Sequence, residues 1–113
     1  MQEAIKAQEE DMVDYNSSED RKECHVQSKS FTIKNKLGIH VRPATQLVKT
    51  ANKFVSDISI KKDGLDIDGK GIMGILMLAA SQGSEIVIRA EGRDAREAIE
   101  ELGRLIEERF GEE

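Results

Sequence analysis

The chain has 113 residues, enough for one domain but too few for two of ordinary size. Its formal net charge of -5 argues against a general affinity for nucleic acid, and no apolar run reaches the roughly 20 residues that cross a bilayer. The single cysteine, Cys24, excludes a disulfide within one chain, and the acidic N-terminus does not resemble a secretory signal, so we expect a cytoplasmic protein.

Charge is distributed unevenly along the chain. Residues 1–29 hold eight acidic against four basic side chains, residues 25–55 hold six basic and no acidic side chains, and residues 94–113 hold eight acidic against three basic. A basic interval between acidic ones indicates an anion site or an acidic protein partner, although a chance cluster on a solvated face gives the same pattern.

Residues 1–28 are predicted to form a flexible acidic N-terminal extension, because their few large apolar side chains follow no clear period. The domain itself is predicted to cover residues 29–113. Its first element is a strand from Ser30, where Phe31 and Ile33 alternate with polar residues. An amphipathic helix then begins near Pro43, with apolar residues at helical spacing: Ala44, Leu47, Val48 and Ala51.

Three further strands follow from alternating apolar residues. Two of them, at residues 58–62 and 65–67, flank the hairpin-type turn signal Asp63-Gly64. The third is centred on Ile86 and Ile88.

Two more helices are predicted in this half of the chain. The run at residues 72–80 is apolar throughout, but its Met, Leu and Ala content favours a short helix. A long helix starts after Asp94 as N-cap and extends to Phe110. The order strand, helix, strand, strand, helix, strand, helix predicts an α+β fold, an open-faced β-sandwich in which three helices cover one face of a four-stranded antiparallel sheet.

Two histidines and one cysteine are the candidates for nucleophilic or metal chemistry. Cys24 and His25 are adjacent, which is not the spacing of zinc ligands, so neither receives a role. His40 directly precedes the predicted helix, where unpaired N–H groups and the positive end of the macrodipole stabilise an anion. Arg42 can hold phosphate oxygens in a bidentate way, and Gly38 lets the backbone turn closely around the site.

Histidine suits a relay of phosphoryl groups. An imidazole titrates near neutrality, so the neutral nucleophile is available, and phosphate on a ring nitrogen leaves more readily than phosphate on serine. The position alone is equally typical of a histidine that caps a helix. No acidic residue can be placed beside His40 from the sequence.

The segment NKLGIHVRPATQLVKTANKF resembles the active-site segment of HPr, the histidine phosphocarrier family of the bacterial sugar phosphotransferase system. The family pattern G-[ILM]-H-[AT]-R-P-A is matched except at Val41. A second segment, KGIMGILMLAASQGSEI, is also similar to the family, and the resemblance covers the chain from Ser30 to Phe110.

This resemblance implies that Nδ1 of His40 accepts phosphate from Enzyme I, itself charged by phosphoenolpyruvate, and that Arg42 assists the transfer. It also implies that Enzyme I and the IIA proteins dock on an exposed apolar patch together with the helix after Pro43. The residues expected to bind phosphate or partners are Gly38, Val41, Pro43, Thr45, Lys49, Ile72, Met73 and Leu76, whereas Ile75 and Leu78 are expected in the core.

One departure from the family pattern concerns regulation. Gram-positive members carry, after the residue that matches Lys70, a serine that a dedicated kinase phosphorylates. Here that position is Gly71, so this switch cannot operate. The segments NKLG and LML are also similar to the nitrogen-related branch of the family, so sugar uptake and a regulatory relay both stay open.

The leading hypothesis is a phosphocarrier that accepts a phosphoryl group from phosphorylated Enzyme I on His40 and passes it to IIA proteins. The alternatives are the nitrogen-related regulatory branch and a regulatory binding module that is not phosphorylated. A relay is an intermediate rather than an independent catalyst, and we expect no cofactor and no metal. The expected partners are Enzyme I and IIA proteins, with no nucleic acid and no membrane insertion, and the expected state is a monomer.

Overall fold

A computed structural model describes residues 25–113, so Cys24 and most of the predicted extension lie outside the described residues. None of the helices in residues 25–113 has the length and apolar character needed to cross a membrane. The elements in chain order are β2 (Val26–Thr32), α2 (Val41–Ala51), β3 (Asp57–Lys62), β4 (Leu65–Asp68), α3 (Ile72–Met77), β5 (Glu85–Glu91), α4 (Ala95–Glu107) and the 3-10 turn η2 (Arg109–Gly111).

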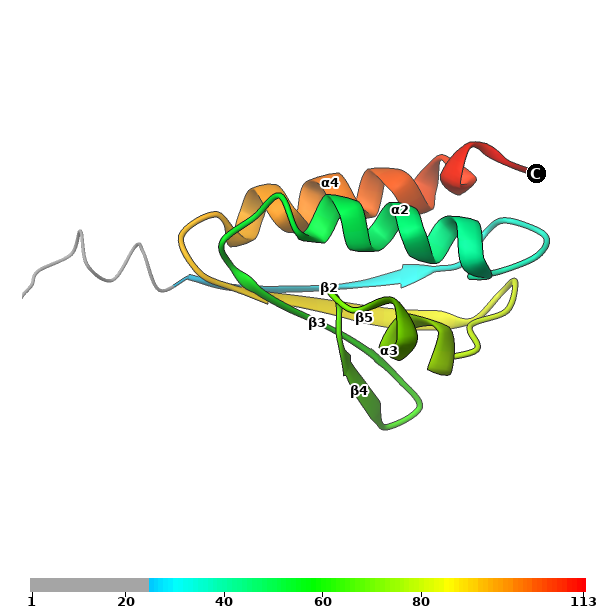
Figure 1. The fold of residues 1–113 in the computed structure, drawn as a ribbon, viewed down its shortest axis with the longest axis horizontal. Helices are drawn as coiled ribbons and strands as arrows, with labels where there is room; N and C mark the ends of the chain where they lie inside the picture. The colour runs from blue at the N-terminus through cyan, green and yellow to red at the C-terminus, as the bar shows by residue number, and fades with distance from the viewer. Residues whose placement is uncertain (1–24) are drawn as a thin grey trace, which may run out of the picture.

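The four strands form one antiparallel sheet in the order β2-β5-β3-β4. Helices α2 and α4 run alongside each other over one face of this sheet, and α3 contacts α2 and β4 (Figure 1). The predicted α+β fold with three helices and an uncovered sheet face is therefore confirmed.

The core lies between the sheet and its helices. In β3 and β5 every second residue is buried, which places Ile60 opposite Ile88 under the helices. Helix α4 approaches the edge strand β2 closely because it carries Gly103, where an added Cβ would lie 2.6 Å from the Phe31 ring. The uncovered face carries polar side chains such as Ser59 and Arg89, as the open-faced architecture requires.

Strand β2 starts at Val26, four residues before the predicted start at Ser30. Residues 26–28 pair with β5, so the predicted domain boundary after residue 28 falls inside a strand. The strand is mostly exposed because it lies at the sheet edge, and its first residues therefore lack the apolar alternation on which the prediction depended.

The last helix is shorter than predicted. Helix α4 ends at Glu107, and Arg109 and Phe110 then take left-handed conformations with φ of 58° and 56°. After this reversal Phe110 is packed in the core with 2% exposure, which stabilises the chain in this conformation. The chain end is thereby folded back toward the start of α2, where it contributes to the site described below.

Asp94 stands at the N-cap of α4 as predicted, but its carboxylate does not cap that helix. It accepts hydrogen bonds from Val55 N at 2.9 Å, from Ser56 N at 3.0 Å and from the Ser56 hydroxyl. Asp94 therefore fastens the loop between α2 and β3 to the start of α4.

Candidate functional site

The site begins with a tight turn at residues 35–38, directly before α2. Gly38 N donates to Asn35 O at 3.2 Å, and Ile39 N donates to Ala80 O at 2.8 Å. Gly38 has φ +70°, and a Cβ added there would lie 2.4 Å from Ala80 O. Glycine is therefore needed at this position both for its backbone conformation and for the close approach to the α3–β5 connection.

His40 is the N-cap residue of α2, with extended backbone angles and no side-chain capping bond. Its carbonyl accepts from Ala44 N at 3.0 Å, so the main chain starts the helix while the ring is left for other contacts. The side chain is 37% exposed and can be reached from solvent. His40 thus occupies the cap position, but its ring does not cap the helix. The first-turn amides of Val41 and Arg42 have no acceptor within the helix by its geometry.

An acidic side chain from the other end of the chain contacts the His40 ring. His40 Nε2 lies 2.9 Å from Glu112 Oε1, across 72 positions of sequence. An ionised carboxylate has no proton to donate, so Nε2 carries the proton and the neutral ring keeps its free lone pair on Nδ1. The sequence alone places no acid beside His40, whereas in the structure the turn after α4 brings Glu112 to the start of α2.

The electrostatics of Glu112 agree with this contact. Hydrogen bonds from His40 and Asn35 hold the pKa of the Glu112 carboxyl below its usual value, and the positive charge of the nearby Arg42 guanidinium acts in the same direction. The carboxylate is therefore ionised throughout the neutral range.

The C-terminal segment that carries Glu112 is fixed at several points. Its Phe110 ring is buried in the core, and Phe110 O accepts from Gln46 Nε2 of α2 at 3.1 Å. Glu113 O accepts from Lys36 N at 2.6 Å. Asn35 Nδ2 donates to Glu112 Oε1 at 2.9 Å.

Three other predicted residues of α2 lie at different distances from His40. Arg42 is exposed in the first turn and forms no ion pair within residues 25–113. Thr45 Oγ1 donates to Val41 O at 2.8 Å inside the helix. Lys49 is exposed nine residues after His40, about 13 Å along the helix axis. Arg42 therefore lies in the turn of α2 that directly follows His40, whereas Lys49 lies near the other end of the helix.

The predicted apolar patch on α3 is divided between surface and core. Met73 is 69% exposed, while Ile72 and Leu76 are half-buried and pack in part against the core. Ile75 and Leu78 are buried, as predicted. On α2, Val41 is exposed next to His40 and Pro43 is buried.

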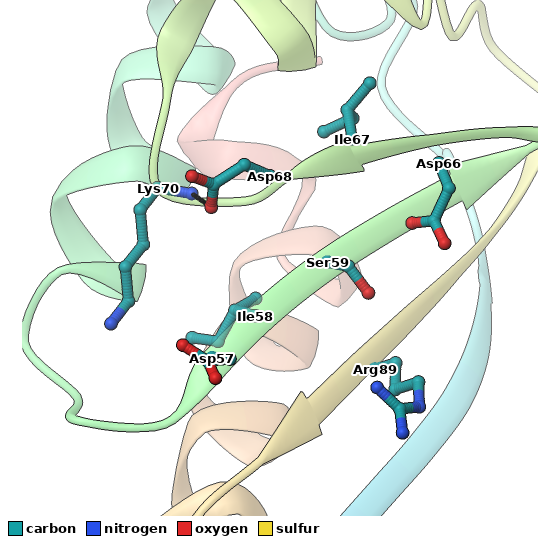
Figure 2. Close-up of a pocket in the computed structure, with 8 residues that line it drawn as sticks. All are labelled: Asp57, Ile58, Ser59, Asp66, Ile67, Asp68, Lys70 and Arg89. Atoms are coloured by element: carbon teal, nitrogen blue, oxygen red, sulfur yellow. Dashed lines mark hydrogen bonds between the residues drawn. The ribbon is translucent and has the colours of Figure 1, made fainter.

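A separate hollow of about 430 Å³ lies on the sheet face that the helices leave uncovered. Figure 2 shows it between β3, β4 and β5, with Asp66 and Asp68 on one side and Arg89 on the other. Lys70 at its edge is already engaged, because its Nζ donates to Phe54 O at 2.8 Å. The hollow includes none of the predicted site residues.

Sequence reasoning missed Asn35 and Glu112. Asn35 follows Phe31 and Ile33 in the inward alternation, and a polar residue at such a position was a detectable signal. No local signal points to Glu112, because its position depends on the reversal after α4.

Comparisons with known proteins match this chain to one protein family. A sequence model of the PTS-HPr family, described as "PTS HPr component phosphorylation site", matches residues 27–108. The chain is 43% identical over 83 residues to the phosphocarrier protein HPr of Xylella fastidiosa, covering 74% of this chain and 93% of that protein.

Two crystal structures of HPr from Thermoanaerobacter tengcongensis are similar to this fold. HPr-C-His matches with a TM-score of 0.75 and 48% identity, over 77% of this chain and 98% of that one. The HPr dimer matches with a TM-score of 0.63 and 50% identity, over 73% of this chain and 94% of that one.

Proposed function

Because the chain belongs to the HPr family of phosphocarrier proteins, we propose that it takes a phosphoryl group onto Nδ1 of His40 from phosphorylated Enzyme I and passes it to IIA proteins of a sugar phosphotransferase system. The observation that carries this proposal is the contact of His40 Nε2 with Glu112 Oε1 at 2.9 Å. Because an ionised carboxylate can only accept, this contact favours the ring proton on Nε2 and supports Nδ1 as the nucleophilic nitrogen.

Phosphoryl transfer to His40 needs no base, because the ring loses no proton. The Nδ1 lone pair forms the new N–P bond while the electron pair of the breaking bond leaves with the donor. The proton stays on Nε2, so the His40 ring takes up one positive charge as the phosphoryl group arrives. The Glu112 carboxylate faces that developing charge, which stabilises the transition state and the product. Transfer to a IIA protein is the reverse displacement.

The phosphoryl oxygens require cationic or N–H partners beside Nδ1. The amides of Val41 and Arg42 are the unpaired donors of the first turn, and the macrodipole of α2 is positive at this end. The exposed Arg42 guanidinium can add a bidentate contact. These groups support a site that binds the phosphoryl group for a limited time without a metal ion.

The docking surface is proposed from exposure on the two helices near the site. Met73 on α3 and Val41 on α2 are large apolar side chains that are 69% and 61% exposed. Helices α2 and α3 contact each other, so these side chains belong to neighbouring elements. Lys49 adds positive charge on α2, which favours an acidic rim on Enzyme I and on the IIA proteins.

The primary test is phosphorylation with purified Enzyme I, phosphoenolpyruvate and magnesium. We expect one phosphate that is labile in acid and stable in alkali, as expected for a phosphoramidate. His40→Ala should remove it. His25→Ala is the matched control because it removes the other histidine, and it should be phosphorylated normally. An unmodified wild type beside an active Enzyme I would contradict the proposal and favour the binding module.

The acceptor distinguishes the branches of the family. We propose the sugar branch, so the phosphorylated protein should transfer its phosphate to a sugar-type IIA protein faster than to a nitrogen-type one. The opposite preference would place it in the nitrogen-related branch. We also propose that the protein acts as a monomeric, stoichiometric relay, which sedimentation analysis before and after phosphorylation tests.

A further inference from the structure

We propose that Asn35 is a positioning residue that fixes the orientation and the tautomer of the His40 ring through two hydrogen-bond acceptors that both residues share. The consequence for phosphoryl transfer rests on the proposed function. The geometry itself belongs to the unphosphorylated chain and can be tested there.

The first shared acceptor is the carbonyl oxygen of Gly38. Asn35 Nδ2 donates to Gly38 O at 2.7 Å, and His40 N donates to the same oxygen at 3.1 Å. Asn35 O in turn accepts from Gly38 N at 3.2 Å. The Asn35 side chain thus closes the turn from inside and fixes the peptide from which the His40 main chain continues.

The second shared acceptor is Glu112 Oε1. It accepts from Asn35 Nδ2 at 2.9 Å and from His40 Nε2 at 2.9 Å. Both N–H groups of the Asn35 amide therefore form hydrogen bonds. One donates to Gly38 O in the main chain before His40, and the other donates to Glu112, which also contacts the His40 ring. A glutamate side chain near a chain end has several rotamers available, and the Asn35 bond selects the one that meets Nε2.

The buried Asn35 side chain uses its N–H donors and leaves its acceptor without a hydrogen bond. The residue is 0% exposed, and its Oδ1 is the one buried side-chain polar atom within residues 25–113 that has no hydrogen-bond partner. An unpaired buried acceptor destabilises a fold, so packing alone would favour an apolar residue here. Rotating the amide by half a turn would direct Oδ1 at two acceptors and leave both N–H groups unpaired. Only the observed orientation forms bonds.

The consequence concerns which ring nitrogen is free. With Glu112 held by Asn35, the proton stays on Nε2 and Nδ1 keeps its lone pair. Without Asn35, Glu112 samples other rotamers and the ring populates both tautomers and other orientations, so a smaller fraction of molecules presents Nδ1 as the nucleophile.

The test is the ¹⁵N NMR spectrum of the His40 ring in the unphosphorylated full chain. Asn35→Asp keeps the shape of the side chain but replaces the donating amide by a carboxylate that faces Glu112. We expect the ratio of the Nε2–H to the Nδ1–H tautomer to fall several-fold. Ser56→Ala is the matched control, because Ser56 is the other buried polar residue of the described part of the chain and is bonded to Asp94 beyond the far end of α2. It should lower stability and leave the tautomer ratio unchanged.

An unchanged ratio in Asn35→Asp, or an equal change in Ser56→Ala, would overturn the proposal. If Asn35→Asp does not fold, Glu112→Ala provides the readout through the side-chain amide signals of Asn35. One amide proton should shift on loss of Glu112 while the proton bound to Gly38 O stays in place, and two unmoved signals would equally overturn the proposal. A tautomer change in a chain that Enzyme I does not phosphorylate would support the positioning role and contradict the proposed function.

Discussion

Replacing Gly38 by alanine should destabilise the domain and disturb the site together. A non-glycine residue in the left-handed region costs roughly 1–2 kcal/mol, and Gly38 has φ +70°. The new Cβ would also lie 2.4 Å from Ala80 O, the atom that accepts from Ile39 N at 2.8 Å. Moving that carbonyl away sacrifices a hydrogen bond worth about 1 kcal/mol and disturbs packing. We expect a loss of roughly 2–4 kcal/mol in the free energy of unfolding.

Gly64→Ala is the matched control for this prediction. Gly64 has φ +84°, but nothing lies within 4 Å of an added Cβ, so only the conformational cost of roughly 1–2 kcal/mol applies. Thermal unfolding followed by far-UV circular dichroism should show a decrease in Tm of roughly 8–30 °C for Gly38→Ala and about 4–16 °C for Gly64→Ala. Only Gly38→Ala should slow phosphorylation by Enzyme I. Equal losses of stability in the two variants would refute the argument from close approach.

Four further predictions follow from the site and the chain end. Arg42→Ala should slow phosphoryl transfer on the order of 100-fold and leave the unfolding free energy within about 0.5 kcal/mol, measured by rapid-quench kinetics and denaturation; normal transfer would remove its assigned role. Met73→Glu should weaken Enzyme I binding in calorimetry without loss of stability, whereas a stability loss at unchanged affinity would make it a core residue. In the folded protein the pKa of Glu112 lies below its ordinary 4.5, so the ionised carboxylate stabilises the fold fully above pH 4.5, and this stabilisation is lost as the pH falls through the lowered pKa. The difference in unfolding free energy between the wild type and Glu112→Gln should therefore vanish in acid. A difference that grows in acid would contradict the lowered pKa. Deleting residues 1–24 should leave Tm and phosphorylation nearly unchanged, and a marked fall in either would show that the extension packs onto the domain.

Much of the fold could be predicted because local and tertiary preferences agree. The turn signal Asp63-Gly64 forms the predicted hairpin, with φ of 51° and 84° at its two residues. The inward alternation of Ile58 and Ile60 places both in the core. His40 stands at the helix start, as its position before Pro43 indicates.

The parts that could not be predicted depend on contacts distant in sequence. Glu112 reaches His40 only because Phe110 finds a buried position, and this forces two non-glycine residues into the left-handed region that no local preference favours. Asp94 is a second example. The sequence predicts that its carboxylate caps α4, but in the structure this carboxylate accepts hydrogen bonds from the loop that carries Ser56. In both cases a tertiary partner replaces the local one.

Phosphorylation of His40 on Nδ1 can be observed by ¹⁵N–³¹P correlation NMR of the chain after reaction with Enzyme I and phosphoenolpyruvate. We expect a single phosphorus bonded to Nδ1 of His40, with the proton still on Nε2. Phosphorus on Nε2, on any other residue, or on no residue at all would contradict it.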